Sequence, residues 1–403
     1  MPHHHGRHRP GDQVAKRNLR RLRLVIAGFV IAVIALPCAN AVMVTVSERS
    51  GAVQQGGVVL PTWKTHGYDG TTTTQAISDI AGLGATWIQF TPTWKMATAT
   101  SSSIDVAWSV TDAGLLAAID LAHSKGLKIL LKPHVDPQDG TNRWEINPSD
   151  RAAWFKSYQS MITHYATIAQ QKGVDEFSVG CELATMSGST DRSAWLTIIN
   201  AIKAIYSGPR VYAATIVEYP NVSFWDQLNF IGIDAYFPLS TTPTTDISAL
   251  EAAWIPIRDR MSAFVVEVGR PILFTEAGYP SLAGAAVEPW NNKYSSTPSQ
   301  PEQAAGYEAL LATFSGQPWW AGAFWWSWWT DNRVYDPLDH AIGGKLAESV
   351  LRNWWASTPY RGPVETCGSD GSGGVGTSQI CGSSARNTQR PSARIRIGQD
   401  ESR

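Results

Sequence analysis

Two stretches decide the fold, and the first reads Phe177-Ser178-Val179-Gly180-Cys181-Glu182-Leu183. The second reads Ile272-Leu273-Phe274-Thr275-Glu276-Ala277-Gly278-Tyr279. In each stretch an apolar run leads straight into a single glutamate. An ionised carboxylate beside a buried strand is costly unless it is paired or lies at an open, polar end of the sheet. Both stretches therefore predict buried strands that end at a polar opening.

Outward from these stretches, short β-branched runs alternate with longer amphipathic segments, which is typical of repeated βα units and a parallel sheet. The predicted strands are 58–63, 86–91, 128–134, 176–182, 210–217, 228–236, 271–276 and 321–327. The predicted helices are 73–83, 112–125, 150–171, 191–206, 247–268, 301–314 and 345–355, and the connection at 221–226 is too short for a full helix.

Eight such units predict a (β/α)8 TIM barrel over residues 57–357. The competing fold, an open doubly wound sheet, usually has a glycine-rich phosphate loop after its first strand. Here Gly56-Gly57 precedes that strand, and Thr62-Trp63-Lys64 follows it. The chemistry of a TIM barrel lies at the C-terminal ends of its strands, so candidate site residues are sought there.

The two ends of the chain differ from this middle part. Residues 1–46 combine a basic leader with an apolar run from Leu24, which fits a secretory signal peptide. Residues 24–46 are also about long enough for an uncleaved membrane anchor. Both alternatives predict a protein that is secreted or anchored at the outer face of the cell membrane. Residues 361–403 are rich in Gly and Ser and are expected to be disordered, with Cys367 and Cys381 able to form a disulfide after export.

The composition excludes one class of partner. The chain has 33 Lys and Arg against 34 Asp and Glu, a net charge of −1, and its middle part has no basic stripe. This balance argues against a nucleic-acid-binding protein. We expect a monomer. The 18 tryptophans are the unusual feature, since an indole ring can stack on a sugar as well as pack in a core.

The two glutamates that follow the fourth and seventh predicted strands suggest a reaction. Two carboxylates about 5–5.5 Å apart can cleave a glycosidic bond with retention of configuration. We assign Glu182 as acid/base and Glu276 as nucleophile. Alternatively, Glu182 forms a salt bridge with Arg192 or Lys132 at the strand end, and Glu276 caps the following loop. The presence of both, on these two strands, favours catalysis.

The arrangement resembles the clan A glycoside hydrolases, and among them the β-mannanases of glycoside hydrolase family 113. The resemblance rests on Gly180–Leu183, Phe274–Tyr279, Leu131-Lys132-Pro133-His134 and the run from Gly322 to Trp328, and covers roughly residues 57–357. It implies endo-hydrolysis of β-1,4-mannan or a related β-linked polysaccharide. Most of the clan has Asn before the acid/base, where this chain has Cys181.

Further residues are expected around the substrate. His134 and Asp136 could hold sugar hydroxyls, and Lys132 could shift the pKa of a carboxylate or form an ion pair inside the barrel. Tyr236, which follows Asp234-Ala235, could donate its hydroxyl to Glu276 or be a core tyrosine. We group all of these, Asp234 included, as substrate-binding. Glu218 is interpreted as a binding residue or a surface group.

The tryptophan run at residues 325–329 cannot face the substrate as a whole, because side chains alternate along a strand. We predict Trp326 as the sugar platform, with Trp325 second and Trp94 further along the glycan. No cofactor or catalytic metal is expected, because carboxylates suffice and no metal-binding or phosphate-binding motif is present. The alternatives are a barrel that binds cell-wall glycan without cutting it, and an exo-β-glycosidase or transglycosylase.

Overall fold

The computed structural model describes residues 54–105, 109–330 and 336–357. The predicted leader or anchor at 1–46, the predicted tail at 361–403 and the Cys367–Cys381 pair lie outside these residues, so they stay predictions. Among the helices of the described part, none is both long enough and apolar enough to cross a membrane.

Eight parallel strands form a closed barrel, which confirms the predicted TIM-barrel fold. Around the barrel the order of strands is β1-β10-β9-β8-β7-β6-β4-β2. Their bounds are β1 Gln55–Pro61, β2 Trp87–Thr91, β4 Lys128–Leu131, β6 Glu176–Cys181, β7 Arg210–Thr215, β8 Ile231–Asp234, β9 Ile272–Ala277 and β10 Trp320–Trp325.

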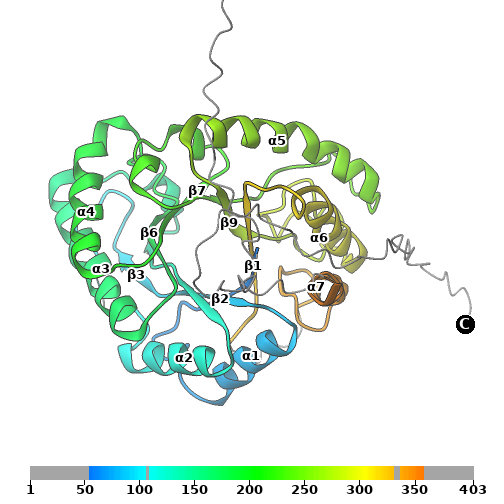
Figure 1. Ribbon diagram of the computed structural model, residues 1–403, viewed down its shortest axis with the longest axis horizontal. Helices are drawn as coiled ribbons and strands as arrows, with labels where there is room; N and C mark the ends of the chain where they lie inside the picture. The colour runs from blue at the N-terminus through cyan, green and yellow to red at the C-terminus, as the bar shows by residue number, and fades with distance from the viewer. Residues whose placement is uncertain (1–53, 106–108, 331–335, 358–403) are drawn as a thin grey trace, which may run out of the picture. The chain divides into compact units, whose positions relative to one another are not determined.

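Helices surround this barrel (Figure 1). Their bounds are α1 Thr71–Gly82, α2 Asp112–Ser124, α3 Arg151–Lys172, α4 Arg192–Ile205, α5 Ile247–Val268, α6 Gln300–Phe314 and α7 Leu346–Ser357. The link between β7 and β8 contains only short 3₁₀ turns, Tyr219–Asn221 and Trp225–Gln227, as its length predicted. Asp150 and Asp246 cap α3 and α5 by accepting backbone N–H groups of the first turn.

One predicted strand is two separate strands. The run 128–134 divides at Pro133 into β4 and β5 (His134–Pro137). A proline has no N–H to donate to a ladder, so it ends β4. Strand β5 then pairs with β3 (Thr93–Met96) in a small parallel sheet outside the barrel. This sheet, which the sequence did not predict, carries His134 and Asp136.

Alternation along the strands sorts the apolar side chains into two clusters. Residues such as Val58, Ile88 and Ile129 face the helices and join the large outer core. Their neighbours in sequence point into the barrel and form a second cluster: Val59, Trp87, Leu130, Val211, Leu273 and Phe324. The barrel interior is therefore a packed core, as in other barrels of this type, and the polar residues lie nearer its ends.

Two strands of the barrel carry one extra residue just before a glutamate. In β6, Ser178 pairs with Val211 of β7, but Cys181 pairs with Ala213, so β6 advances three residues while β7 advances two. In β9 the register shifts in the same way between Phe274 and Glu276. Such β-bulges redirect the side chains that follow them. Strict alternation from the inward-facing Leu273 would turn Glu276 toward the helices.

Candidate active site

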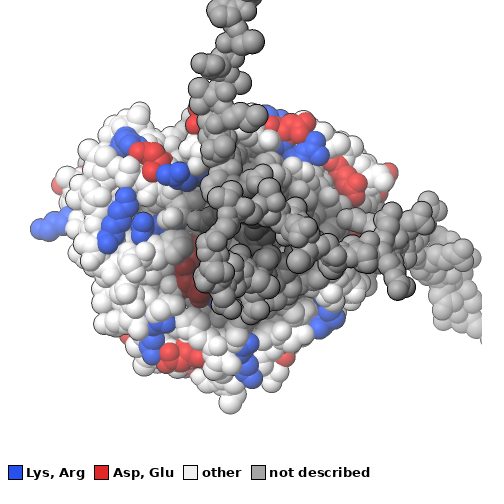
Figure 2. Space-filling view, in the orientation of Figure 1, with Lys and Arg blue, Asp and Glu red and all other residues white. Residues whose placement is uncertain are grey.

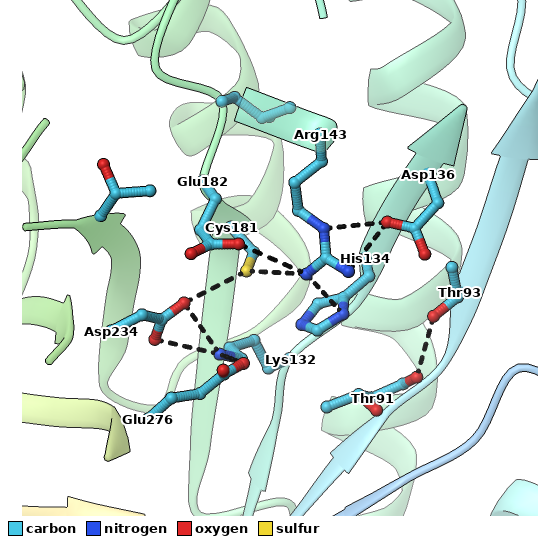
Figure 3. Close-up of polar contacts among 12 residues, drawn as sticks. Thr91, Thr93, Lys132, His134, Asp136, Arg143, Cys181, Glu182, Asp234 and Glu276 are labelled. Atoms are coloured by element: carbon cyan, nitrogen blue, oxygen red, sulfur yellow. Dashed lines mark hydrogen bonds and ion pairs between the residues drawn. The ribbon is translucent and has the colours of Figure 1, made fainter. Parts of the chain in front are cut away.

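Glu276 lies beyond the shift in β9, and its carboxylate has partners from two other strands. Lys132, just after β4, places Nζ 2.6 Å from Glu276 Oε1 (Figure 3). Tyr236, just after β8, donates its hydroxyl to Glu276 Oε2 over 2.8 Å. This hydrogen bond is the first of the two roles that the sequence suggested for Tyr236. The carboxylate thus has a cation at one oxygen and a donor at the other, which fixes its direction.

Lys132 and Asp234 form a buried layer beneath Glu276. Lys132 Nζ lies 3.2 Å from Asp234 Oδ1, and the Thr275 hydroxyl donates to the same oxygen over 2.7 Å. Burial opposes the charge of Lys132, but Asp234 and Glu276 outweigh it and raise its pKa. Burial and the charge of Glu276 raise the pKa of Asp234 to about 6. Neither side chain is exposed, and Lys132 forms the ion pair inside the barrel that the sequence suggested as one alternative. Substrate binding by these two residues stays a prediction.

Glu182 directly follows β6 and adopts a left-handed backbone conformation, with φ 53°. Such a conformation costs a residue other than glycine roughly 1–2 kcal/mol. Its carboxylate lies 3.9 Å from Arg143 Nη1. Burial raises its pKa well above the usual value, and the charges of Asp234 and Glu276 add to this effect against the opposing charge of Arg143. A protonated carboxyl group is therefore favoured at Glu182.

The sequence suggested Arg192 or Lys132 as the salt-bridge partner of Glu182, and both suggestions are wrong. Arg192 pairs with Asp226, 2.9 Å away at the surface, while Lys132 is engaged by Asp234 and Glu276. The partner, Arg143, comes instead from a 3₁₀ turn after β5, Arg143–Glu145. A search of strand ends could not find it, because a loop carries it into the site.

Arg143 organises the rim beside Glu182. Its guanidinium lies 2.8 Å from His134 Nδ1, 2.8 Å from Asp136 Oδ1 and 3.4 Å from Cys181 Sγ. Burial, with the nearby cations, lowers the pKa of His134 well below its usual value, so a neutral ring accepts the Arg143 hydrogen bond. His134 and Asp136 were predicted to hold sugar hydroxyls. In the structure they hold Arg143, and His134 is buried.

The same cluster contains side chains of metal-binding types. One ligand atom each from His134, Cys181 and Glu276 lie within 4.8 Å of one another. However, Lys132 is 2.6 Å from Glu276 and Arg143 is 3.4 Å from Cys181. Two cations therefore already lie beside these side chains, and they would repel a metal ion. The cluster therefore fits ion-paired carboxylates better than a metal centre.

Two of the predicted sugar platforms lie side by side in sequence but in different surroundings. Trp325 is buried and stacks on Tyr307 with ring centroids 4.1 Å apart, so its prediction as a platform is wrong. Trp326 is half-buried and meets Trp63 edge-on at 6.0 Å. Trp63 is 36% exposed, and its indole N–H donates to Asp136. Trp63 was not predicted as a sugar platform, but it belongs to the same aromatic group as Trp326.

The third predicted platform, Trp94, packs against helix α3. Its indole N–H donates to the Tyr165 hydroxyl over 2.8 Å, and its ring meets Tyr165 at 6.2 Å. It is half-buried against the outer core. This packing gives Trp94 a structural role, and a sugar-stacking role has no support from its contacts.

The fold and the paired glutamates define a glycoside hydrolase built on a TIM barrel. The chain belongs to glycoside hydrolase family 113, whose model matches residues 61–342. This match confirms the resemblance seen in the sequence.

Solved structures agree with the family match. The chain is 27% identical to a family 113 β-1,4-mannanase, over 76% of this chain and 99% of that one, with a TM-score of 0.68. It is 26% identical to the β-mannanase of Alicyclobacillus acidocaldarius, over 75% and 97% of the two chains, also with a TM-score of 0.68. A Faecalibacterium prausnitzii β-glucuronidase, 15% identical over 77% of this chain and 50% of its own, shares the fold with a TM-score of 0.55. No curated protein sequence matches this chain.

Proposed function

We propose that this protein is a retaining endo-β-1,4-mannanase in which Glu276 is the nucleophile and Glu182 the acid/base. One observation carries the assignment: the two glutamates have opposite electrostatic surroundings. Glu276 is 2.6 Å from an ammonium group and accepts a tyrosine hydrogen bond, as a nucleophilic carboxylate requires. Glu182 has a raised pKa, as a proton donor requires. Two carboxyl groups in such different surroundings are the usual sign of this division of labour.

The reaction proceeds in two displacements. First, a Glu276 oxygen bonds to the anomeric carbon while the glycosidic C–O bond breaks, and the Glu182 proton passes to the departing sugar oxygen. Second, Glu182, now a carboxylate, takes a proton from water as the water oxygen attacks the same carbon and releases Glu276. The configuration is retained because it is inverted twice. Lys132 and Tyr236 remain on Glu276 throughout and aim it at the carbon.

The positions of exposed tryptophans support endo action. Exposed indoles lie on three connections that leave barrel strands at their C-terminal ends: Trp63 after β1, Trp144 between β4 and α3, and Trp290 after β9. Exposed aromatic rings of this kind are platforms for stacking. On the face in Figure 2, positive and negative side chains are interspersed around the outer edge of the view.

The first test compares Glu276→Gln and Glu182→Gln with the parent for release of reducing ends from mannan. We expect each change to lower kcat by about 10²–10⁴-fold. Glu267→Gln, at an exposed position on α5, is the matched control and should leave the rate unchanged. Unchanged release in both site variants would reject the assignment and leave a barrel that binds glycan without cutting it.

Two further measurements test the finer parts of the proposal. Proton NMR of the first product should show the β-anomer, as expected for retention. Product lengths over time should show an early spread of sizes, whereas a single small product would indicate an exo-acting enzyme. Parallel assays on glucomannan, β-glucan and xylan identify the sugar.

We also propose that the enzyme acts outside the cell, where a polymeric substrate is found, with residues 1–46 as signal or anchor. N-terminal sequencing of the protein recovered from culture medium and from membranes distinguishes cleavage from anchoring. A protein found only in the cytoplasm would contradict this proposal.

A further inference from the structure

The backbone around Glu182 is held by the neighbouring strand β7. The Glu182 N–H donates to the Ala213 carbonyl over 2.7 Å. The next N–H, of Leu183, donates to the Tyr212 hydroxyl over 2.8 Å. These two bonds lie on either side of a residue whose φ of 53° is unfavourable for anything but glycine. Adjacent residues of β7 therefore hold Glu182 in a conformation that it would not keep by itself.

A second carboxylate orients the Tyr212 hydroxyl. Because this oxygen accepts the Leu183 N–H, its single proton is free to donate elsewhere. It donates to Glu218 Oε1 over 2.5 Å. The other Glu218 oxygen accepts the Thr215 N–H over 3.0 Å. Glu218 was interpreted from sequence as a binding residue or a surface group. In the structure it is buried, so the second of these alternatives, a surface group, is wrong.

The sequence of β6 makes room for this arrangement. A side chain at Gly180 would place its Cβ 2.8 Å from Tyr212 Cε2 and 3.0 Å from the Trp195 ring. Glycine at this position therefore lets the Tyr212 ring lie against the end of β6. The hydroxyl then reaches past Glu182 to the Leu183 N–H. Gly180, Tyr212 and Glu218 form a continuous buried support beneath the residue.

We infer that Tyr212 and Glu218 are positioning residues for the acid/base Glu182. The inference rests on the proposed function, because it gives Glu182 the task of protonating the departing oxygen. A general acid must lie within hydrogen-bond reach of that oxygen, and small displacements are costly in rate. The contacts from Glu218 through Tyr212 to the Leu183 N–H fix the backbone next to Glu182, and therefore the position of the Glu182 side chain. Neither Tyr212 nor Glu218 touches the substrate.

The test uses two substrates that differ in their need for acid catalysis. Departure of a mannose hydroxyl from a manno-oligosaccharide requires protonation, whereas 2,4-dinitrophenolate leaves a mannobioside without it. Tyr212→Phe keeps the ring and removes the hydroxyl. We expect kcat/KM to fall about tenfold on the oligosaccharide, the size of one lost hydrogen bond, and less than twofold on the aryl mannobioside. KM for the oligosaccharide should stay unchanged while kcat falls.

Tyr158→Phe is the matched control. The Tyr158 hydroxyl is also buried and donates to β6, at the Val179 carbonyl over 2.8 Å, but it lies before Glu182 rather than after it. Both variants lose a buried hydroxyl. Their thermal midpoints are measured, so that an effect of lost stability on activity can be recognised. Only Tyr212→Phe should change the ratio of the two kcat/KM values. Equal ratios in both variants would overturn the inference.

Two substitutions at Glu218 complete the experiment. Glu218→Leu removes both acceptors and should reproduce the Tyr212→Phe ratio. Glu218→Gln retains one acceptor and should lie between Glu218→Leu and the parent. If Glu218→Leu instead leaves the ratio unchanged, Glu218 has no positioning role.

Glu182→Gln distinguishes a failure of the acid/base assignment from a failure of the positioning role. It should show the same substrate pattern as Tyr212→Phe, but more strongly. If Glu182→Gln affects both substrates equally, the acid/base assignment fails. If Glu182→Gln shows the pattern and Tyr212→Phe does not, only the positioning role fails.

Discussion

Strand β6 has a buried or partly buried glutamate at each end, and the two carboxyl groups have very different partners. Glu176, its first residue, accepts one hydrogen bond from Gln55 over 2.9 Å, and within the described residues no cation pairs with it. Glu182, just past the last residue, lies among Arg143, Asp234 and Glu276. Burial raises the pKa of both.

The difference between the two ends concerns what surrounds the carboxyl group. At the N-terminal ends of the barrel strands, here called the lower end, no cation in the described part of the chain offsets the effect of burial on Glu176. Burial therefore raises the pKa of Glu176 to about 8. At the C-terminal ends of the strands, here called the mouth, Lys132 pairs with Glu276 and Arg143 lies beside Glu182. Several opposite charges are therefore close together. In TIM barrels the C-terminal ends of the strands carry the chemistry, and the opposite face carries stability. The two glutamates of β6 show this division within one strand.

The largest effect on this difference between the two ends should come from removing the buried cation Lys132. Lys132→Met leaves Asp234 and Glu276 buried without a counter-charge, and we expect a loss of about 3–5 kcal/mol in the free energy of unfolding, together with loss of activity. Urea unfolding measures the first effect. The control is Lys172→Met, which breaks the partly exposed pair with Asp120 and should cost at most about 1 kcal/mol. Equal effects would mean that the buried cation has no special role.

The lower end should show its effect in the pH dependence of stability. Glu176 holds its proton up to about pH 8 when folded, against a usual value of 4.5. The folded state therefore binds more protons than the unfolded state between these values, and stability falls as pH rises through this window. Glu176→Gln should remove that fall and stabilise the protein at pH 9 by an amount on the order of 2–4 kcal/mol.

Activity separates this change from those at the mouth. Glu176→Gln should leave kcat at the optimum pH unchanged, because the residue lies at the far end of the barrel from Glu276. Thermal melts of the parent and the variant from pH 5 to pH 9 provide the stability comparison, with the exposed Glu267→Gln as control. Parallel pH profiles for the parent and Glu176→Gln would contradict the burial argument.

Arg143 offers a finer test at the mouth. Its positive charge lowers the pKa of Glu182 against the effect of burial. Arg143→Gln should raise that pKa, so Glu182 stays protonated to higher pH and the alkaline limb of kcat/KM moves to higher pH. Arg192→Gln is the control, because Arg192 pairs with Asp226 at the surface. An unchanged or downward shift of the alkaline limb would contradict the role given to Arg143.

The smallest expected effect concerns tryptophans at the two ends. Trp144→Ala or Trp290→Ala should raise KM for mannan about fivefold, at the low end of values for aromatic stacking, and leave KM for mannotriose unchanged. Trp87 starts β2 at the lower end, where it packs beneath Lys128 with Nζ 5.5 Å from the ring centroid. Trp87→Phe should change stability alone. A similar rise of KM on both substrates would argue against distal platforms.

Much of the fold could be read from periodicity. Short β-branched runs and the amphipathic segments between them predicted all eight barrel strands and seven helices to within a few residues. Strand β5 was missed because only two residues lie between it and β4, and the missing N–H of Pro133 is the one local signal that separates them. Of the candidate site, Glu182, Glu276, Lys132 and Tyr236 could be found because each ends a barrel strand.

Other features depend on contacts between distant segments. Arg143 reaches Glu182 from a loop, and no local pattern distinguishes it from other arginines. Trp325 and Trp326 are adjacent in sequence, but the stacking of Tyr307 on Trp325 decides which of them is buried. Glu218 resembles a surface residue until the fold places Tyr212 against it.

The sequence by itself determined the barrel, because the patterns of helices and strands follow from local backbone geometry. It also determined that a glutamate lies at the end of the fourth and of the seventh barrel strand. Only the tertiary structure decided which way the seventh-strand glutamate faces. One extra residue in β9 reverses the alternation, and it is visible only in the register of β9 with its neighbours β8 and β10. A side chain's direction along a strand has a period of two, so a single inserted residue moves it from one face of the sheet to the other.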